Sequence, residues 1–161
     1  MPTGVFLSGY LLVWSGFSAT ATLANWGLHA NFLLSSMMGT STSSYLGGAL
    51  LMTAGAFQWS PLKSACLTHC RSPLGFLMSD WREGTGGALR MGLRHGAYCV
   101  GCCWTLMGLL FVLGVMNLLW IAALAAFVLL EKVAPGGRRF SRGTGLLLFG
   151  WGALMAAGVL R

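Results

Sequence analysis

The sequence predicts an all-α, polytopic helical membrane protein, with about five transmembrane helices and short helices at the membrane interface. Of its 161 residues, 56% are apolar and only 8% carry a charge, whereas about a quarter of the residues of an ordinary soluble domain are charged. Residues 1–62, 97–130 and 143–160 contain no Asp, Glu, Lys or Arg. A helix needs roughly 20 apolar residues to cross a bilayer. These stretches therefore exclude a soluble fold.

The apolar stretches are continuous, which favours helices over a membrane barrel, whose strands alternate over about ten residues. The 24 glycines fit close packing between membrane helices. As one helix, residues 97–130 would rise about 51 Å, which exceeds the membrane core. We therefore expect two crossings with a turn at 114–117, where Asn117 is a turn residue. The predicted spans, within one membrane domain of residues 1–161, are 5–26, 45–60, 97–113, 117–131 and 144–160.

The charge distribution predicts the orientation of these spans. The net charge is +7, and the basic residues gather in 61–96 and 132–142, so the positive-inside rule places both segments in the cytoplasm. Because this rule explains the charge, we expect no nucleic-acid binding. The first apolar run follows no basic residue and precedes no clear cleavage site, so we interpret it as a retained span. The predicted location is the bacterial cytoplasmic (inner) membrane, with the lipid bilayer as a partner.

Segment 61–96 is predicted to lie at the membrane interface. Serine precedes proline at Ser60-Pro61 and at Ser72-Pro73, and a capping residue before proline is typical of a helix start. We expect short helices over 61–70 and 73–82, with Phe76 and Trp81 toward lipid, and a further long helix that starts after a break at 84–87. Lys63 is expected either to anchor the interface by snorkelling or to neutralise nearby thiolates.

The main functional signal is the clustering of all five cysteines and two of the three histidines within 66–103. Residues four apart share a helix face, so Cys66 and Cys70 project together from the first short helix. On the long helix, His95, Cys99 and Cys102 fall within an arc of about 60°. Imidazole and thiolates at such spacings can hold a metal ion. The predicted metal ligands are Cys66, Cys70, His95, Cys99, Cys102 and Cys103.

Thiolate-rich sites favour Cu(I), Zn(II) or iron–sulfur chemistry. Met91 and Met107 extend the ligand stripe, which favours copper over zinc, although methionine is also common in helix packing. Haem and iron–sulfur groups are less favoured, and no CxxCH motif for covalent haem occurs. Inert packing of small thiols and thiol redox chemistry remain open alternatives. No catalytic triad, phosphate-binding glycine loop or catalytic carboxylate pair is found, so the sequence gives no reason to assign an enzymatic reaction.

The sequence also resembles a known family over about residues 45–136. The resemblance rests on PLKSACLTHCRSPLGFL, WREGTGGALRMGLRHGAYCVGCCWTLMGLLF, GVMNLLWI and EKVAPGG, which are similar to segments of the bacterial domain-of-unknown-function family 2182, described as predicted metal-binding integral membrane proteins. The resemblance implies a metal-binding membrane protein whose Cys/His pattern falls on the six predicted ligands. Members of that family usually have a further upstream span, so we expect a truncated start.

We therefore predict a membrane-embedded protein that binds a soft metal, with copper favoured, for trafficking, sensing or delivery. Its expected partners are a metal donor or acceptor protein or a larger membrane complex, and it is a candidate homo-oligomer. One alternative is a membrane thiol–disulfide or quinone oxidoreductase, because a helical bundle with two cysteine pairs suits thiol exchange. A second alternative is a haem-binding accessory subunit of a membrane complex, with His95 as an axial ligand.

Overall fold

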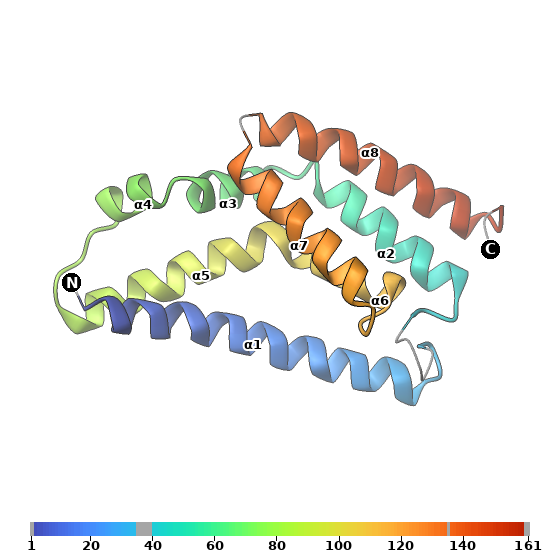
Figure 1. The fold of residues 1–161 in the computed structure, drawn as a ribbon, viewed down its shortest axis with the longest axis horizontal. Helices are drawn as coiled ribbons and strands as arrows, with labels where there is room; N and C mark the ends of the chain where they lie inside the picture. Colours follow the sequence, from blue (N-terminus) through green and yellow to red (C-terminus); the bar gives the residue numbers. More distant parts are fainter. Residues whose placement is uncertain (1, 35–39, 135, 160–161) are drawn as a thin grey trace. The chain divides into compact units, whose positions relative to one another are not determined.

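The structure, a computed structural model, describes residues 2–34, 40–134 and 136–159. These residues form eight α-helices and no strand (Figure 1), apart from an isolated bridge between Leu34 and Ser41. The predicted all-helical fold is confirmed for this part of the chain. The helices are α1 (Thr3–Ala30), α2 (Ser44–Phe57), α3 (Pro61–Arg71), α4 (Pro73–Ser79), α5 (Gly84–Gly108), α6 (Leu110–Leu113), α7 (Leu118–Val133) and α8 (Gly137–Ala156).

Two stretches of the described chain are long and apolar enough to cross a membrane. They are Thr3–Ala30, which is α1, and Gly84–Leu113, which joins α5 to α6. Helix α2 is apolar but shorter, at 14 residues. By length and composition the structure thus offers two candidate spans, and the five predicted spans stay a prediction.

The chain divides into two compact units. Unit 1 contains Met1–Thr22 and Pro61–Cys102, and unit 2 contains Leu23–Ser60 and Cys103–Arg161. The candidate metal centre lies almost entirely in unit 1.

Glycines let α1 and α5 approach closely inside unit 1. A Cβ added at Gly9 would lie 2.5 Å from the Leu89 carbonyl oxygen, and one at Gly92 would collide with the backbone of Phe6. At Gly96 an added Cβ would come within 3.2 Å of the Tyr10 carbonyl oxygen. Small residues at such crossings are typical of tightly packed membrane helices. This contact brings the aromatic residues of α1 next to the ligand-bearing part of α5.

The two short helices predicted after Ser60 and Ser72 are present as α3 and α4. Ser72 is the N-cap of α4 with proline following it, but its side chain makes no capping hydrogen bond. The break before α5 falls at Gly84, whose φ of 78° favours glycine. Trp81 is 54% exposed, as expected for an interfacial residue.

Two expectations for this segment are wrong. Phe76 was expected to face lipid, but it is only 3% exposed, because its ring packs against the rings of His95 and Tyr98 on α5. Of the two roles expected for Lys63, anchoring the interface by snorkelling does not fit, because the residue is only 1% exposed. The sequence pattern of a short helix such as α4 does not reveal which of its faces another helix covers.

In unit 2, α2 and α8 run side by side (Figure 1). Added Cβ atoms at Gly48 and Gly55 on α2 would come within 2.8 and 2.7 Å of backbone oxygens on α8, so these glycines set the helix spacing. A buried hydrogen bond also joins the two helices, since the Ser141 hydroxyl donates to Gln58 Oε1 at 2.9 Å.

The chain turns between α6 and α7 at residues 114–117, where the length of the apolar run predicted a turn. Gly114 has a φ of 101°, and the Asn117 side chain caps α7 by accepting a hydrogen bond from the Leu119 N–H at 3.1 Å. The predicted role of Asn117 as a turn residue is therefore confirmed.

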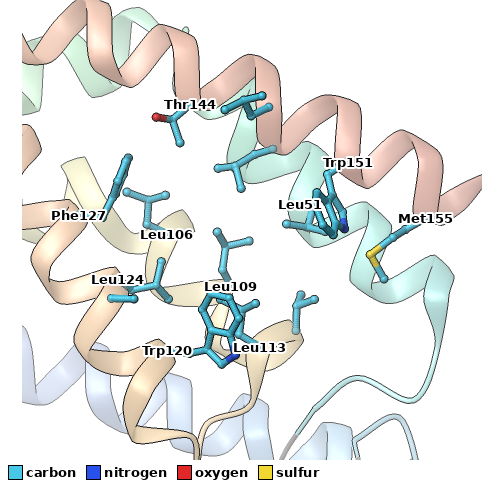
Figure 2. A pocket seen from close by; sticks show the side chains of 14 residues that line it. Leu51, Leu106, Leu109, Leu113, Trp120, Leu124, Phe127, Thr144, Trp151 and Met155 are labelled. Atoms are coloured by element: carbon cyan, nitrogen blue, oxygen red, sulfur yellow. The ribbon is translucent and has the colours of Figure 1, made fainter. Parts of the chain in front are cut away.

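Unit 2 also contains an apolar pocket of about 520 Å³. Residues of α2, α5, α6, α7 and α8 line it, among them Leu124, Trp120 and Trp151 (Figure 2). Its one lining hydroxyl, on Thr144, donates to the Phe140 carbonyl oxygen at 3.0 Å. The pocket therefore offers little polar chemistry.

Candidate metal centre

The candidate centre is built where α3 faces α5 within unit 1. Helix α3 carries Cys66 and Cys70, and α5 carries His95, Cys99 and Cys102. Cys103 also lies on α5, but it belongs to unit 2. All five cysteines are thiols rather than disulfides.

The closest approach between predicted ligands joins Cys70 to Cys99. Their Sγ atoms lie 2.8 Å apart, with one thiol donating to the other. A disulfide bond is much shorter, at about 2.05 Å. Cys99 is 4% exposed and Cys70 is half-buried, so one sulfur is shielded while the other remains partly accessible. Sequence spacing placed Cys70 on the same face of α3 as Cys66, and the structure brings the Cys70 thiol against a cysteine of α5.

His95 lies one helical turn before Cys99, and its Nε2 atom is 3.9 Å from the Cys99 Sγ atom. Three aromatic rings surround the imidazole, with centroid distances of 6.1 Å to Phe6, 6.1 Å to Tyr10 and 5.1 Å to Phe76. This aromatic surround restricts the orientation of the imidazole. The structure thus brings together Cys70, Cys99 and His95.

The other predicted ligands are placed differently. The Cys66 Sγ atom lies against α5 at Gly101, where an added Cβ would come within 3.0 Å of it. Burial raises the pKa of the Cys66 thiol, and the neighbouring Cys70 raises it further. Both effects disfavour the thiolate form of Cys66. The Cys102 thiol donates to the Cys99 carbonyl oxygen at 3.1 Å.

Met91 and Met107, which extended the predicted ligand stripe, differ in burial and in the unit to which they belong. Met91 is 1% exposed, and its Sδ atom accepts a hydrogen bond from the Arg82 N–H at 3.4 Å. Met107 is half-buried and belongs to unit 2.

His69 is not among the six predicted ligands, but the structure gives it a defined position. Its ring stacks on Tyr98 with centroids 4.4 Å apart and an angle of 17° between the planes. Tyr98 also accepts a hydrogen bond from Arg94 Nε at 3.2 Å, and Arg94 forms an ion pair with Asp80 at 2.7 Å. The signal for His69 was available in its position directly before Cys70.

Among the residues that the structure describes, no group of three or more His, Cys, Asp or Glu side chains is arranged to hold a metal ion. A structural zinc site takes four ligands, whereas Cu(I) prefers soft thiolates and can be bound by two of them. The zinc–thiolate bond is about 2.3 Å long, so an ion held between Cys70 and Cys99 requires their sulfurs to move apart from 2.8 Å. The donor set therefore fits Cu(I) better than Zn(II).

These features define a class of protein. It is all-helical, and two of its helices are long and apolar enough to span a membrane. It also has a thiol pair beside an imidazole, and these groups suit a soft metal. A protein-family model described as PpoB2, copper chaperone, matches residues 2–155. The chain belongs to this copper chaperone family, which supports a copper-related role. No curated protein matches the chain, and neither does any solved structure.

Proposed function

We propose that this protein is a membrane-embedded copper chaperone that holds Cu(I) as cargo between the thiolates of Cys70 and Cys99 and delivers it to a partner protein. The observation that carries the proposal is the 2.8 Å approach of these two sulfurs from different helices. The copper chaperone family supports the choice of metal.

The binding geometry suits a protein that must release its cargo. The sulfurs of Cys70 and Cys99 meet, and Cys70 is partly accessible, so an acceptor thiolate can reach the ion without unfolding α3 or α5. His95 stands beside Cys99 as a third donor. We propose that Cys66, Cys102 and Cys103, the other predicted ligands, hold the ion less directly or not at all.

The test is a competition titration of purified full-length protein with a coloured Cu(I) chelator, together with elemental analysis. We expect one Cu(I) per chain in the wild type, little Zn(II), and loss of copper binding in Cys70→Ser and Cys99→Ser. Far-ultraviolet circular dichroism of each variant checks that the helices are retained. A wild type that withdraws no copper from the chelator would refute the proposal.

The same thiol pair supports one alternative function, thiol–disulfide exchange. Two thiols at 2.8 Å can be oxidised by a disulfide substrate, which takes up the two electrons and two protons that the thiols release. Titration of thiols after treatment with oxidised glutathione distinguishes the two functions. Five reactive thiols in the denatured protein would support the chaperone, whereas three would support the oxidoreductase.

We further propose that five spans hold the protein in the bacterial cytoplasmic membrane, with α3 and α4 on the cytoplasmic side. The basic residues of 61–96 and 132–142 support this orientation through the positive-inside rule. Alkaline phosphatase fused after Ser79 should be inactive, because that enzyme folds only outside the cytoplasm, whereas a fusion after Met116 should be active. The reverse pattern would refute the orientation.

A further inference from the structure

His69 has a hydrogen bond that fixes which of its ring nitrogens can bind a metal. Its Nδ1 atom lies 2.9 Å from the Ala65 carbonyl oxygen. A carbonyl oxygen only accepts hydrogen bonds, so Nδ1 must carry the proton. In the neutral ring the lone pair is then on Nε2. Histidines that ligate metals commonly donate the other ring N–H to a backbone carbonyl or carboxylate in this way.

The ring of His69 is also held in place without being buried. It stacks on Tyr98 at 4.4 Å and is half-buried. His69 directly precedes Cys70, and Tyr98 directly precedes Cys99. The stacked rings and the paired sulfurs are therefore two neighbouring contacts between α3 and α5. A metal ion bound at Nε2 of His69 would therefore be held by the residue that directly precedes Cys70 in the chain.

We infer that His69 is the uptake ligand of the chaperone, which takes Cu(I) from a donor through Nε2 and passes it to the Cys70 thiol. This inference rests on the proposed function. In the transfer step the Cu–Sγ bond to Cys70 forms as the Cu–Nε2 bond breaks, and the thiol proton goes to water. Copper stays Cu(I) throughout, so no electrons are exchanged.

A residue that speeds uptake should affect the rate of copper transfer more than the final amount of copper bound. The probe is the coloured Cu(I)–bicinchoninate complex, whose loss of absorbance on mixing with full-length protein gives the uptake rate. His69→Phe keeps an aromatic ring for the stack on Tyr98 and removes the nitrogen. We expect its uptake rate to fall at least tenfold, while one Cu(I) per chain still binds at equilibrium.

The matched control is His29→Phe, which makes the same substitution in the last turn of α1 in unit 2 and should leave the rate unchanged. Added imidazole should restore uptake by a His69→Ala variant, which a purely structural role of the ring would not allow. Equal rates for wild type and His69→Phe would overturn the inference, as would loss of equilibrium binding in His69→Phe. A wild type that binds no Cu(I) would instead refute the proposed function.

Discussion

The Cys70 Sγ atom on α3 and the Cys99 Sγ atom on α5 lie 2.8 Å apart although 29 positions separate them in the sequence. Each thiol follows directly after a ring of the stacked pair His69–Tyr98. The contact between the two helices thus includes one pair of sulfurs and one pair of rings. This arrangement ties the position of the thiols to the packing of α3 on α5.

If the thiol pair holds copper, substitutions of different cysteines should lower the Cu(I) affinity by different amounts. We predict that Cys70→Ser and Cys99→Ser each lower Cu(I) affinity by about 100-fold or more, because loss of a direct ligand should cost at least as much as loss of a supporting group. Cys103→Ser, in unit 2, should change the affinity far less. Chelator competition at fixed pH measures all three. Similar losses in the three variants would show that the site extends beyond the pair.

His95 should strengthen copper binding without being essential for it. We predict that His95→Phe lowers Cu(I) affinity by about 10-fold and leaves the stoichiometry at one, since both thiolates remain. Phenylalanine suits the aromatic surround of Phe6, Tyr10 and Phe76, so thermal unfolding should change little. Complete loss of copper with an unchanged unfolding temperature would instead make His95 an obligatory ligand.

The hydrogen bond between Ser141 and Gln58 should contribute to the stability of unit 2. Both residues are buried, at 3% exposure each, and removing one partner of a buried hydrogen bond costs about 1–3 kcal/mol. We predict a free energy of unfolding lower by that amount in Ser141→Ala. Thr53→Ala, an exposed position on α2, should have a negligible effect. Denaturant titration, monitored by circular dichroism, compares the two variants with the wild type. Equal unfolding midpoints for Ser141→Ala and the wild type would contradict the prediction.

Much of the fold could be predicted from local signals. The Ser-Pro pairs marked the starts of α3 and α4, and the length of the run 97–130 predicted the turn at which Asn117 caps α7. A soft-metal role could also be predicted from residue types, because cysteine thiolates are soft ligands, and the preference for copper came from Met91 and Met107. These features depend on residues near each other in the sequence, so no tertiary contact is needed to infer them.

The contacts between side chains of the site could not be predicted in the same way. Helical spacing correctly places Cys66 and Cys70 on one face, but it does not show that Cys70 meets Cys99 while Cys66 lies against Gly101. The burial of Phe76 was also missed, because it depends on how α4 packs on α5. Contacts between helices depend on their crossing geometry, which periodicity in one helix does not encode.

The glycines of α5 provide a test of the contact that orients His95. An added Cβ at Gly92 would collide with the backbone of Phe6, whereas one at Gly16 on α1 would meet nothing within 4 Å. Alanine normally stabilises a helix interior by about 0.5–1 kcal/mol relative to glycine. We therefore predict that Gly16→Ala raises the unfolding temperature slightly.

Gly92→Ala should have the opposite effect, because overpacking a tight contact costs about 1–3 kcal/mol. It should also weaken Cu(I) binding, since α1 supplies two of the rings around His95, from Phe6 and Tyr10. Thermal unfolding and chelator competition on the same samples measure both effects. If Gly92→Ala stabilises the protein as much as Gly16→Ala does, α1 does not pack on α5 as described, and the surround of His95 must be formed by other residues.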